Sequence, residues 1–400
     1  MNKLKTIGFS FVLTFAVLLQ ACTKDDDLST KKTDLKVTIE NPTGLQNVEL
    51  KSGTISFTEI NSGDVTSSDE FTDNELIVTL TEGSYDISFE GEIEYQLDGK
   101  TQTSTVRGYQ TGLVLNGPTA VTTIDLFLHS ETAGFVIKEI FFTGTGSFEG
   151  KPYHGDKYFI IQNNSDEVLY ADGLVIAESA FTTTSKTQYT PDIMNEAFTA
   201  GDRSIVMIPG NGEDYPIEPG ASFTIANNAI NHLELNPNSL DLTGAEFELE
   251  LIANLNVDNP EVPNLTNIIL PLLMHDRGFK SYVLAKFEVS PEEFKVQNKY
   301  TYEYVASGIE RSRDAYKIPN EWIIDAVNLS VEAEFQWIVT SPSLDMGWTY
   351  VGKVDSDESR YGKSVTRKVL STTPDGREIL QDTNNSTVDF EPETIPSLMN

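Results

Sequence analysis

The sequence predicts an all-β protein with two β-sandwich domains, the second of which carries a long mixed insertion. The 400-residue chain contains many β-branched and aromatic residues, which favour strands. Short apolar segments alternate with polar residues at the period of two that is typical of half-buried strands. The 27 glycines and 17 prolines are spread along the chain as turn formers, and no long segment has the apolar period of a helix.

The first 21 residues predict a lipoprotein signal peptide. Lys3 and Lys5 precede an apolar run at 7–19, which is too short for a membrane-spanning helix of about 20 residues. The run ends in Leu-Gln-Ala-Cys at 19–22, which resembles a lipobox of the Bacteroidota type. We therefore expect lipid attachment at Cys22, and several acyl chains would make this anchor effectively permanent.

Residues 22–33 are expected to form a polar tether behind the lipid. Lys24, Asp25 and Asp26 follow Cys22 closely, and this arrangement resembles the surface-export signal of Bacteroidota lipoproteins. The resemblance implies an outer-membrane protein that faces the medium. The alternative is a flexible tether without a sorting role.

Cysteine content and charge exclude several classes of function. Cys22 is the only cysteine, so no disulfide, cysteine–zinc site or thiol nucleophile is expected in the mature chain. The net charge is −33, and removal of the signal peptide takes away only two lysines. Such a charge repels phosphate backbones, so nucleic acid is not an expected partner.

The first folded domain is expected at 34–130. Asp98-Gly99 predicts the turn of a β-hairpin. The segment 80–91, in which a glycine turn feeds a strand opened by Tyr85, resembles the carboxypeptidase-regulatory-like (transthyretin-like) sandwiches. This resemblance implies a non-catalytic domain that spaces or braces another one. The positions expected to alternate into its core are Leu35, Val37, Ile39, Ile55, Phe57, Ile77, Val78, Leu80, Tyr85, Ile87, Phe89, Ile93, Tyr95, Leu97, Ile124, Leu126 and Leu128.

The second domain is expected at 134–400. Segments at 134–142, 157–177, 217–226, 324–327 and 362–390 match, in order, the strands and the closing Asp-Thr-Asn-Asn pattern of the lamin-tail family. This resemblance implies an immunoglobulin-like sandwich in which residues 134–250 and 321–390 pair in one sheet system. About 65 residues, 256–320, stand where that family has a short connection, and we expect them to project from one end.

The insertion contains the candidate binding residues. Ser290, Pro291 and Glu293 predict the start of a short helix. Aromatic and basic residues follow, and such side chains supply most binding hot spots. The residues expected to contact a partner are Tyr304, Arg311, Arg313 and Tyr316.

Catalytic and metal-binding patterns are few. The four histidines at 129, 154, 232 and 275 lack the i, i+4 spacing of a helical zinc pair and are interpreted as surface or loop residues. Carboxylates at 355–358 and Asp375 lack the full spacing of a calcium loop. We therefore expect no catalytic residue, metal or cofactor.

Taken whole, the chain resembles a Bacteroidota surface lipoprotein family of unknown function. The resemblance implies a binding or accessory subunit of an outer-membrane uptake system, beside a TonB-dependent receptor and an unknown extracellular ligand. Two alternatives stay open. One is a structural or adhesive surface module, and the other is a hydrolase with a site in the 256–320 insertion.

Overall fold

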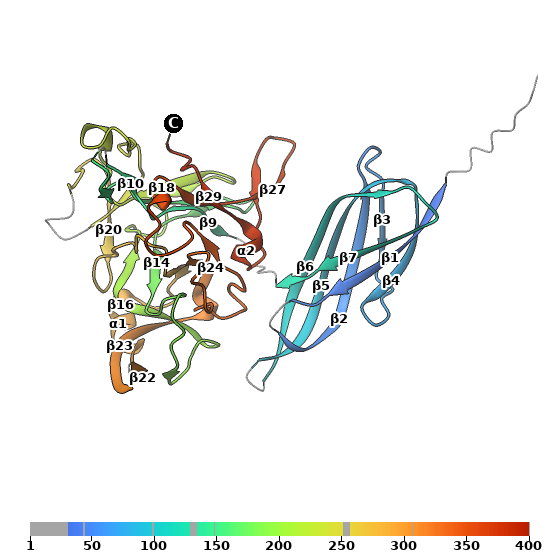
Figure 1. Cartoon of the computed structure of the whole chain (residues 1–400), viewed down its shortest axis with the longest axis horizontal. Coiled ribbons are helices and arrows are strands. Elements are labelled where there is room, and N and C mark those ends of the chain that lie inside the picture. Colours follow the sequence, from blue (N-terminus) through green and yellow to red (C-terminus); the bar gives the residue numbers. More distant parts are fainter. Residues whose placement is uncertain are drawn as a thin grey trace, which may run out of the picture.

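The computed structural model describes residues 31–42, 45–97, 100–128, 134–147, 149–250, 257–306 and 308–399. The signal peptide, Cys22 and the export signal at Lys24, Asp25 and Asp26 lie outside these residues. Within them the chain is almost entirely strand and loop, in two bodies (Figure 1). None of the described helices has the length and apolar character needed to cross a membrane.

Two facing sheets form the first unit. A three-stranded sheet has the order β4-β1-β7, in which β1 and β7 are parallel, and a five-stranded sheet has the order β3-β2-β5-β6-β8. The strands are β1 (Lys32–Glu40), β2 (Gln46–Glu59), β3 (Val65–Ser68), β4 (Glu75–Thr81), β5 (Gly83–Leu97), β6 (Lys100–Leu115), β7 (Thr119–Asp125) and β8 (Phe127–Leu128).

The expected alternation of the first unit is largely confirmed. Residues such as Leu35, Phe57 and Phe89 are buried in one core between the two sheets. The prediction for Ile77 is wrong. It was expected in the core, but in β4 the side chains of Leu76 and Leu80 are buried while Ile77 is exposed.

Two further expectations concern the limits of strands in the first unit. The β5–β6 hairpin forms with Leu97 opposite Lys100, although its Asp98-Gly99 turn lies outside the described residues. β1 begins at Lys32, so the last two residues of the expected tether belong to the first sheet.

The second unit contains all the remaining elements. Its longer strands are β9 (Phe135–Phe141), β12 (Tyr158–Asn163), β14 (Leu174–Ser179), β16 (Ala197–Met207), β18 (Ser222–Ala226), β21 (Ser281–Lys286), β22 (Lys299–Ala306), β23 (Ile309–Pro319), β24 (Ile323–Ser330), β26 (Ser364–Arg367), β27 (Val369–Thr372) and β29 (Phe390–Thr394). Its shorter strands are β10 (Thr145–Gly146), β11 (Pro152–Tyr153), β13 (Leu169–Tyr170), β15 (Tyr189–Thr190), β17 (Pro216–Ile217), β19 (Phe247–Leu249), β20 (Asn264–Asn267), β25 (Thr349–Tyr350) and β28 (Glu378–Leu380). The helices are α1 (Pro291–Gln297) and α2 (Ser386–Asp389), with 3₁₀ turns at His232–Glu234, Asn320–Trp322 and Glu358–Arg360.

Distant parts of the chain share the large sheet of the second unit. β9 pairs with β12 and β26, and β21 pairs with β14 and β24. The sheet curves around its main buried cluster, which includes Phe159, Tyr282 and Val327, until β24 lies against β9 and β25 against β29, so it is nearly closed. The expected pairing of 134–250 with 321–390 in one sheet system is therefore confirmed.

The insertion at 256–320 does not project as a whole, which corrects the expectation. β21 lies in the middle of the sheet, and its residues Tyr282, Val283 and Leu284 are fully buried. A strand with apolar residues on both faces needs cover on both faces, and only an interior position provides it. The β22–β23 hairpin and α1 lie together at one end of the unit (Figure 1).

A buried ionic network holds the last strands of the sheet. The Arg367 guanidinium donates two hydrogen bonds to Asp325, at 2.6 and 2.7 Å, and one to Asp382 at 3.1 Å. Asp389 lies 3.7 Å away, and the cation stands over the Phe390 ring at 4.6 Å. The network joins β24, β26 and the start of β29, so it ties the C-terminal segment to the sheet.

Candidate binding site at the β22–β23 hairpin

The candidate residues of the insertion fall on a β-hairpin. In β22 and β23 the register places Tyr304 opposite Arg311 and Tyr302 opposite Arg313. Side chains alternate between the faces of a strand, so these four residues share one face. Gly308 has a φ of 75° in the connection, a conformation that glycine adopts without steric cost.

Aromatic packing anchors the tyrosine-bearing face. Tyr302 is buried against Phe181, with ring centroids 5.1 Å apart, and against Tyr189 at 5.9 Å. Trp337 also belongs to this cluster, with its ring centroid 5.7 Å from that of Phe181. The aromatic cluster gives the hairpin a rigid base, because several interlocked rings restrict one another's rotamers.

Tyr316 does not belong with the other candidates, which is a correction. It stands opposite Lys299, and its ring stacks on Phe294 with centroids 5.8 Å apart. Phe294 is fully buried in α1, which begins with a complete capping box formed by Ser290 and Glu293, as the sequence predicts. Tyr316 therefore supports the hairpin from the opposite face.

Arg311 and Arg313 are two free cations near the tip of the hairpin. Both are exposed, and within the described part of the chain neither side chain has an ion pair or a hydrogen bond, although both backbones pair with β22. Arg313 is near enough to Lys280 to affect it: burial lowers the pKa of Lys280, and the positive charge of Arg313 lowers it further. Two unpaired guanidinium groups two residues apart can bind carboxylates in bidentate fashion.

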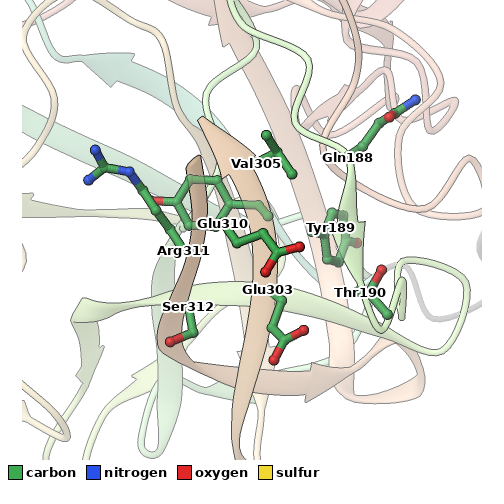
Figure 2. Close-up of a pocket in the computed structure, with 9 residues that line it drawn as sticks. Gln188, Tyr189, Thr190, Glu303, Val305, Glu310, Arg311 and Ser312 are labelled. Atoms are coloured by element: carbon green, nitrogen blue, oxygen red, sulfur yellow. The ribbon is translucent and has the colours of Figure 1, made fainter. Parts of the chain in front are cut away.

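A surface groove of about 530 Å³ lies beside this pair of arginines. It forms where β15 adds to the hairpin, with Tyr189 opposite Tyr304 and Thr190 opposite Glu303. Figure 2 shows Arg311 pointing away from Tyr189 and Thr190, across the hairpin. The residues that line the groove are Gln188, Tyr189, Thr190, Glu303, Tyr304, Val305, Glu310, Arg311 and Ser312.

Only part of this site follows from the sequence. Tyr304, Arg311 and Arg313 are predicted and lie together in the structure, whereas the carboxylates Glu303 and Glu310 are not predicted. Their alternation with the tyrosines and arginines is a signal that could have placed them on the hairpin. No local signal could have placed Gln188 and Thr190 there, because β15 and β22 are far apart in the chain.

The histidines that the structure describes have structural partners. His232 is buried, contrary to expectation, with Nδ1 2.7 Å from the Tyr153 hydroxyl and Nε2 2.9 Å from the Asn228 carbonyl oxygen. His154 Nε2 lies 3.5 Å from Asp276. His129 lies outside the described residues, and within them no group of three or more His, Cys, Asp or Glu could hold a metal ion.

The carboxylates considered for calcium have other roles. Asp355 accepts two hydrogen bonds from Arg277, at 2.8 and 3.0 Å. Asp357 caps the turn at Glu358–Arg360, and the hydrogen bonds that it accepts lower its pKa to about 2. Asp375 accepts a hydrogen bond from the Thr373 hydroxyl.

Comparisons with known proteins give a family likeness without an activity. A comparison with curated proteins finds no match. A structure of a DUF3823 family protein from Parabacteroides merdae is 10% identical and covers 72% of this chain and 99% of its own, but its TM-score of 0.16 supports no argument about the fold.

A second solved structure is similar over almost the whole chain. It is described as a DUF4876 family protein from Bacteroides thetaiotaomicron, and it is 25% identical with a TM-score of 0.55. The alignment covers 91% of this chain and 96% of that one. Residues 218–397 also match the sequence profile of the family described as "Protein of unknown function (DUF4876)", so this part of the chain is similar to an uncharacterised family that has a member in Bacteroides.

Proposed function

We propose that the protein is a lipid-anchored surface protein of the outer membrane whose β22–β23 hairpin binds a partner. The anchor is Cys22, and Lys24, Asp25 and Asp26 direct the protein to the outer leaflet. The partner is a TonB-dependent receptor or the extracellular ligand that such a receptor imports. The resemblance of segment 80–91 to carboxypeptidase-regulatory-like sandwiches supports a spacing role for the first unit.

One observation carries the binding proposal. Arg311 and Arg313 are exposed and without described partners, while the face that bears them is fixed by the buried Tyr302. A packed tyrosine side chain loses little entropy on binding, and tyrosine and arginine are both frequent in hot spots. In a chain of net charge −33, two unpaired guanidinium groups also direct an acidic partner to one place.

The proposed role is binding and not catalysis. The groove offers hydroxyl, amide and carboxylate groups, and among the described residues that line it there is no histidine, cysteine or lysine. Glu303 and Glu310 are the acids of the groove, and in a binding site they accept hydrogen bonds from hydroxyl or amino groups of the partner.

A pull-down from detergent-solubilised outer membranes tests the proposal. The partner recovered with the wild-type protein is measured against an Arg311→Ala/Arg313→Ala variant. We expect a loss of at least about tenfold in affinity, which corresponds to about 1.4 kcal/mol. Tyr316 is left unchanged, because its packing on Phe294 would confound binding with stability.

The matched control is a Lys151→Ala/Lys353→Ala variant, which removes two exposed positive charges elsewhere on the same unit. It should bind within about twofold of the wild type, since exposed charges away from the interface contribute little. An affinity loss below about threefold for the arginine variant, or an equal loss in the control, would contradict the hairpin as the contact surface.

A further inference from the structure

Over residues 309–314, one edge of β23 has no neighbouring strand among the residues that the structure describes. β16 pairs with β23 only where Ala197 to Ala200 face Pro319 to Tyr316, and it then turns to pair with β14 and β20. Over 309–314, β23 pairs only with β22 within the described residues, and all six residues are exposed. The backbone N–H and C=O groups on this edge are therefore available to another chain.

The charges along this edge have a symmetric order. Residues 310–314 read Glu-Arg-Ser-Arg-Asp, with Ser312 at the centre. Arg311 and Arg313 lie on one face of the strand, while Glu310 and Asp314 lie on the other. Asp314 is already paired with Lys299 at 2.7 Å, whereas the two arginines have no described partner.

We propose that an extended segment of the partner adds to this edge as a further strand, with acidic side chains at positions i and i+2 opposite Arg311 and Arg313. The inference rests on the proposed function and names the chemistry of the partner. Backbone hydrogen bonds along about 20 Å of edge would give affinity, and the two arginines would set the register. Because the charge order is symmetric, the same partner pattern fits a parallel or an antiparallel strand.

A second copy of this chain is a poor occupant of the edge. Pairing centred on Ser312 would place Arg311 opposite Arg313 of the second copy and Glu310 opposite its Asp314. Like charges directly opposite each other destabilise a strand pair. The edge therefore resists self-association and favours a different chain with alternating acidic residues.

A synthetic peptide tests the inference on the full-length protein. The probe is the fluorescein-labelled peptide Thr-Lys-Glu-Thr-Glu-Lys-Thr. Its two glutamates stand at positions i and i+2, and its sequence is the same in both directions. We expect saturable binding by fluorescence anisotropy with a Kd below about 1 mM. The Arg311→Glu/Arg313→Glu variant should bind at least about tenfold more weakly, whereas the Lys151→Glu/Lys353→Glu control, which has the same net charge, should bind within about twofold of the wild type.

Backbone methylation separates strand addition from simple ion pairing. A version of the peptide that is N-methylated at each of its central amides keeps the charges but cannot donate backbone hydrogen bonds to the edge of β23 in either orientation. It should bind at least about tenfold more weakly than the unmodified peptide. Equal affinity of the two versions, or no binding of the unmodified peptide at about 1 mM, would overturn the inference.

The two proposals can fail separately. If the Arg311→Ala/Arg313→Ala variant loses the partner in the pull-down but the peptide does not bind, strand addition is wrong and the proposed binding role stands. If the peptide binds, methylation weakens its binding as expected and the pull-down is unaffected, the edge is a strand-addition site and the proposed role of the hairpin is wrong.

Discussion

Replacing Arg367 by methionine should destabilise the second unit strongly. The Arg367 side chain is 1% exposed and forms ion pairs with Asp325 at 2.6 Å and Asp382 at 3.1 Å. It also donates a hydrogen bond to the Ile137 carbonyl oxygen of β9 at 2.9 Å. Methionine would fill much of the space but leave buried carboxylates without their cation. Breaking a buried ion pair in this way costs about 3–5 kcal/mol.

The cost should depend on pH. Burial raises the pKa of Asp325 in the network to about 6, above an ordinary value of about 3.9. A carboxyl group whose folded-state pKa is raised contributes stability at low pH, and this contribution is lost as the pH rises from about 4 through about 6. Without the Arg367 charge the pKa of Asp325 rises further, so the variant continues to lose stability above about pH 6, where the wild type no longer does. The deficit of the variant should therefore be larger at about pH 7 than at about pH 5.

Urea denaturation followed by tryptophan fluorescence measures this effect in the second unit, because Trp322, Trp337 and Trp348 are the three tryptophans of the chain. An Arg203→Met variant is the control, since Arg203 is exposed, and it should change the free energy of unfolding by less than about 0.5 kcal/mol. A loss below about 1 kcal/mol for the Arg367 variant, or an equal loss at both pH values, would refute the reasoning.

Three further predictions concern anchoring, export and the support of the hairpin. Cys22→Ala should accumulate as an unlipidated precursor, and unchanged membrane retention with surface labelling would contradict the anchor. Neutralising the charges at 24–26 should leave lipidation intact but retain the protein on the periplasmic face, so protease added to whole cells should no longer remove it; continued removal would show that the tether has no sorting role. Phe294→Ala should cost about 3–5 kcal/mol in chemical denaturation because a fully buried ring is deleted, whereas the exposed Val296→Ala should change little; equal effects would show that α1 does not support the hairpin.

Local patterns predicted much of the fold. The alternation of Leu35, Val37 and Ile39 predicted β1, because a half-buried strand needs apolar side chains on one face only. The run from Ser290 to Glu293 predicted the start of α1, because the hydrogen bonds that begin a helix join residues only three positions apart. Ile77 was assigned to the wrong face, since adjacent apolar residues leave the phase of a short strand undetermined.

The candidate site was predicted only in part. Tyr304, Arg311 and Arg313 share one face as their positions in two paired strands require. Tyr316 differs in parity from the two arginines, so strict alternation would have placed it on the opposite face from the sequence alone. The contribution of Thr190 could not be predicted, because it depends on the pairing of β15 with a strand distant in the chain.

The sequence by itself determined the elements of this protein: which segments form strands, where α1 begins, and where aromatic and basic side chains gather. These properties depend on side-chain period and on hydrogen bonds between near neighbours. The tertiary structure decided that β21 lies inside the sheet, that Arg367 is buried among carboxylates, and that β16 leaves β23 after Ala200. Pairing between distant segments depends on which arrangement buries the most apolar surface while satisfying the backbone hydrogen bonds. Local sequence patterns do not predict this arrangement.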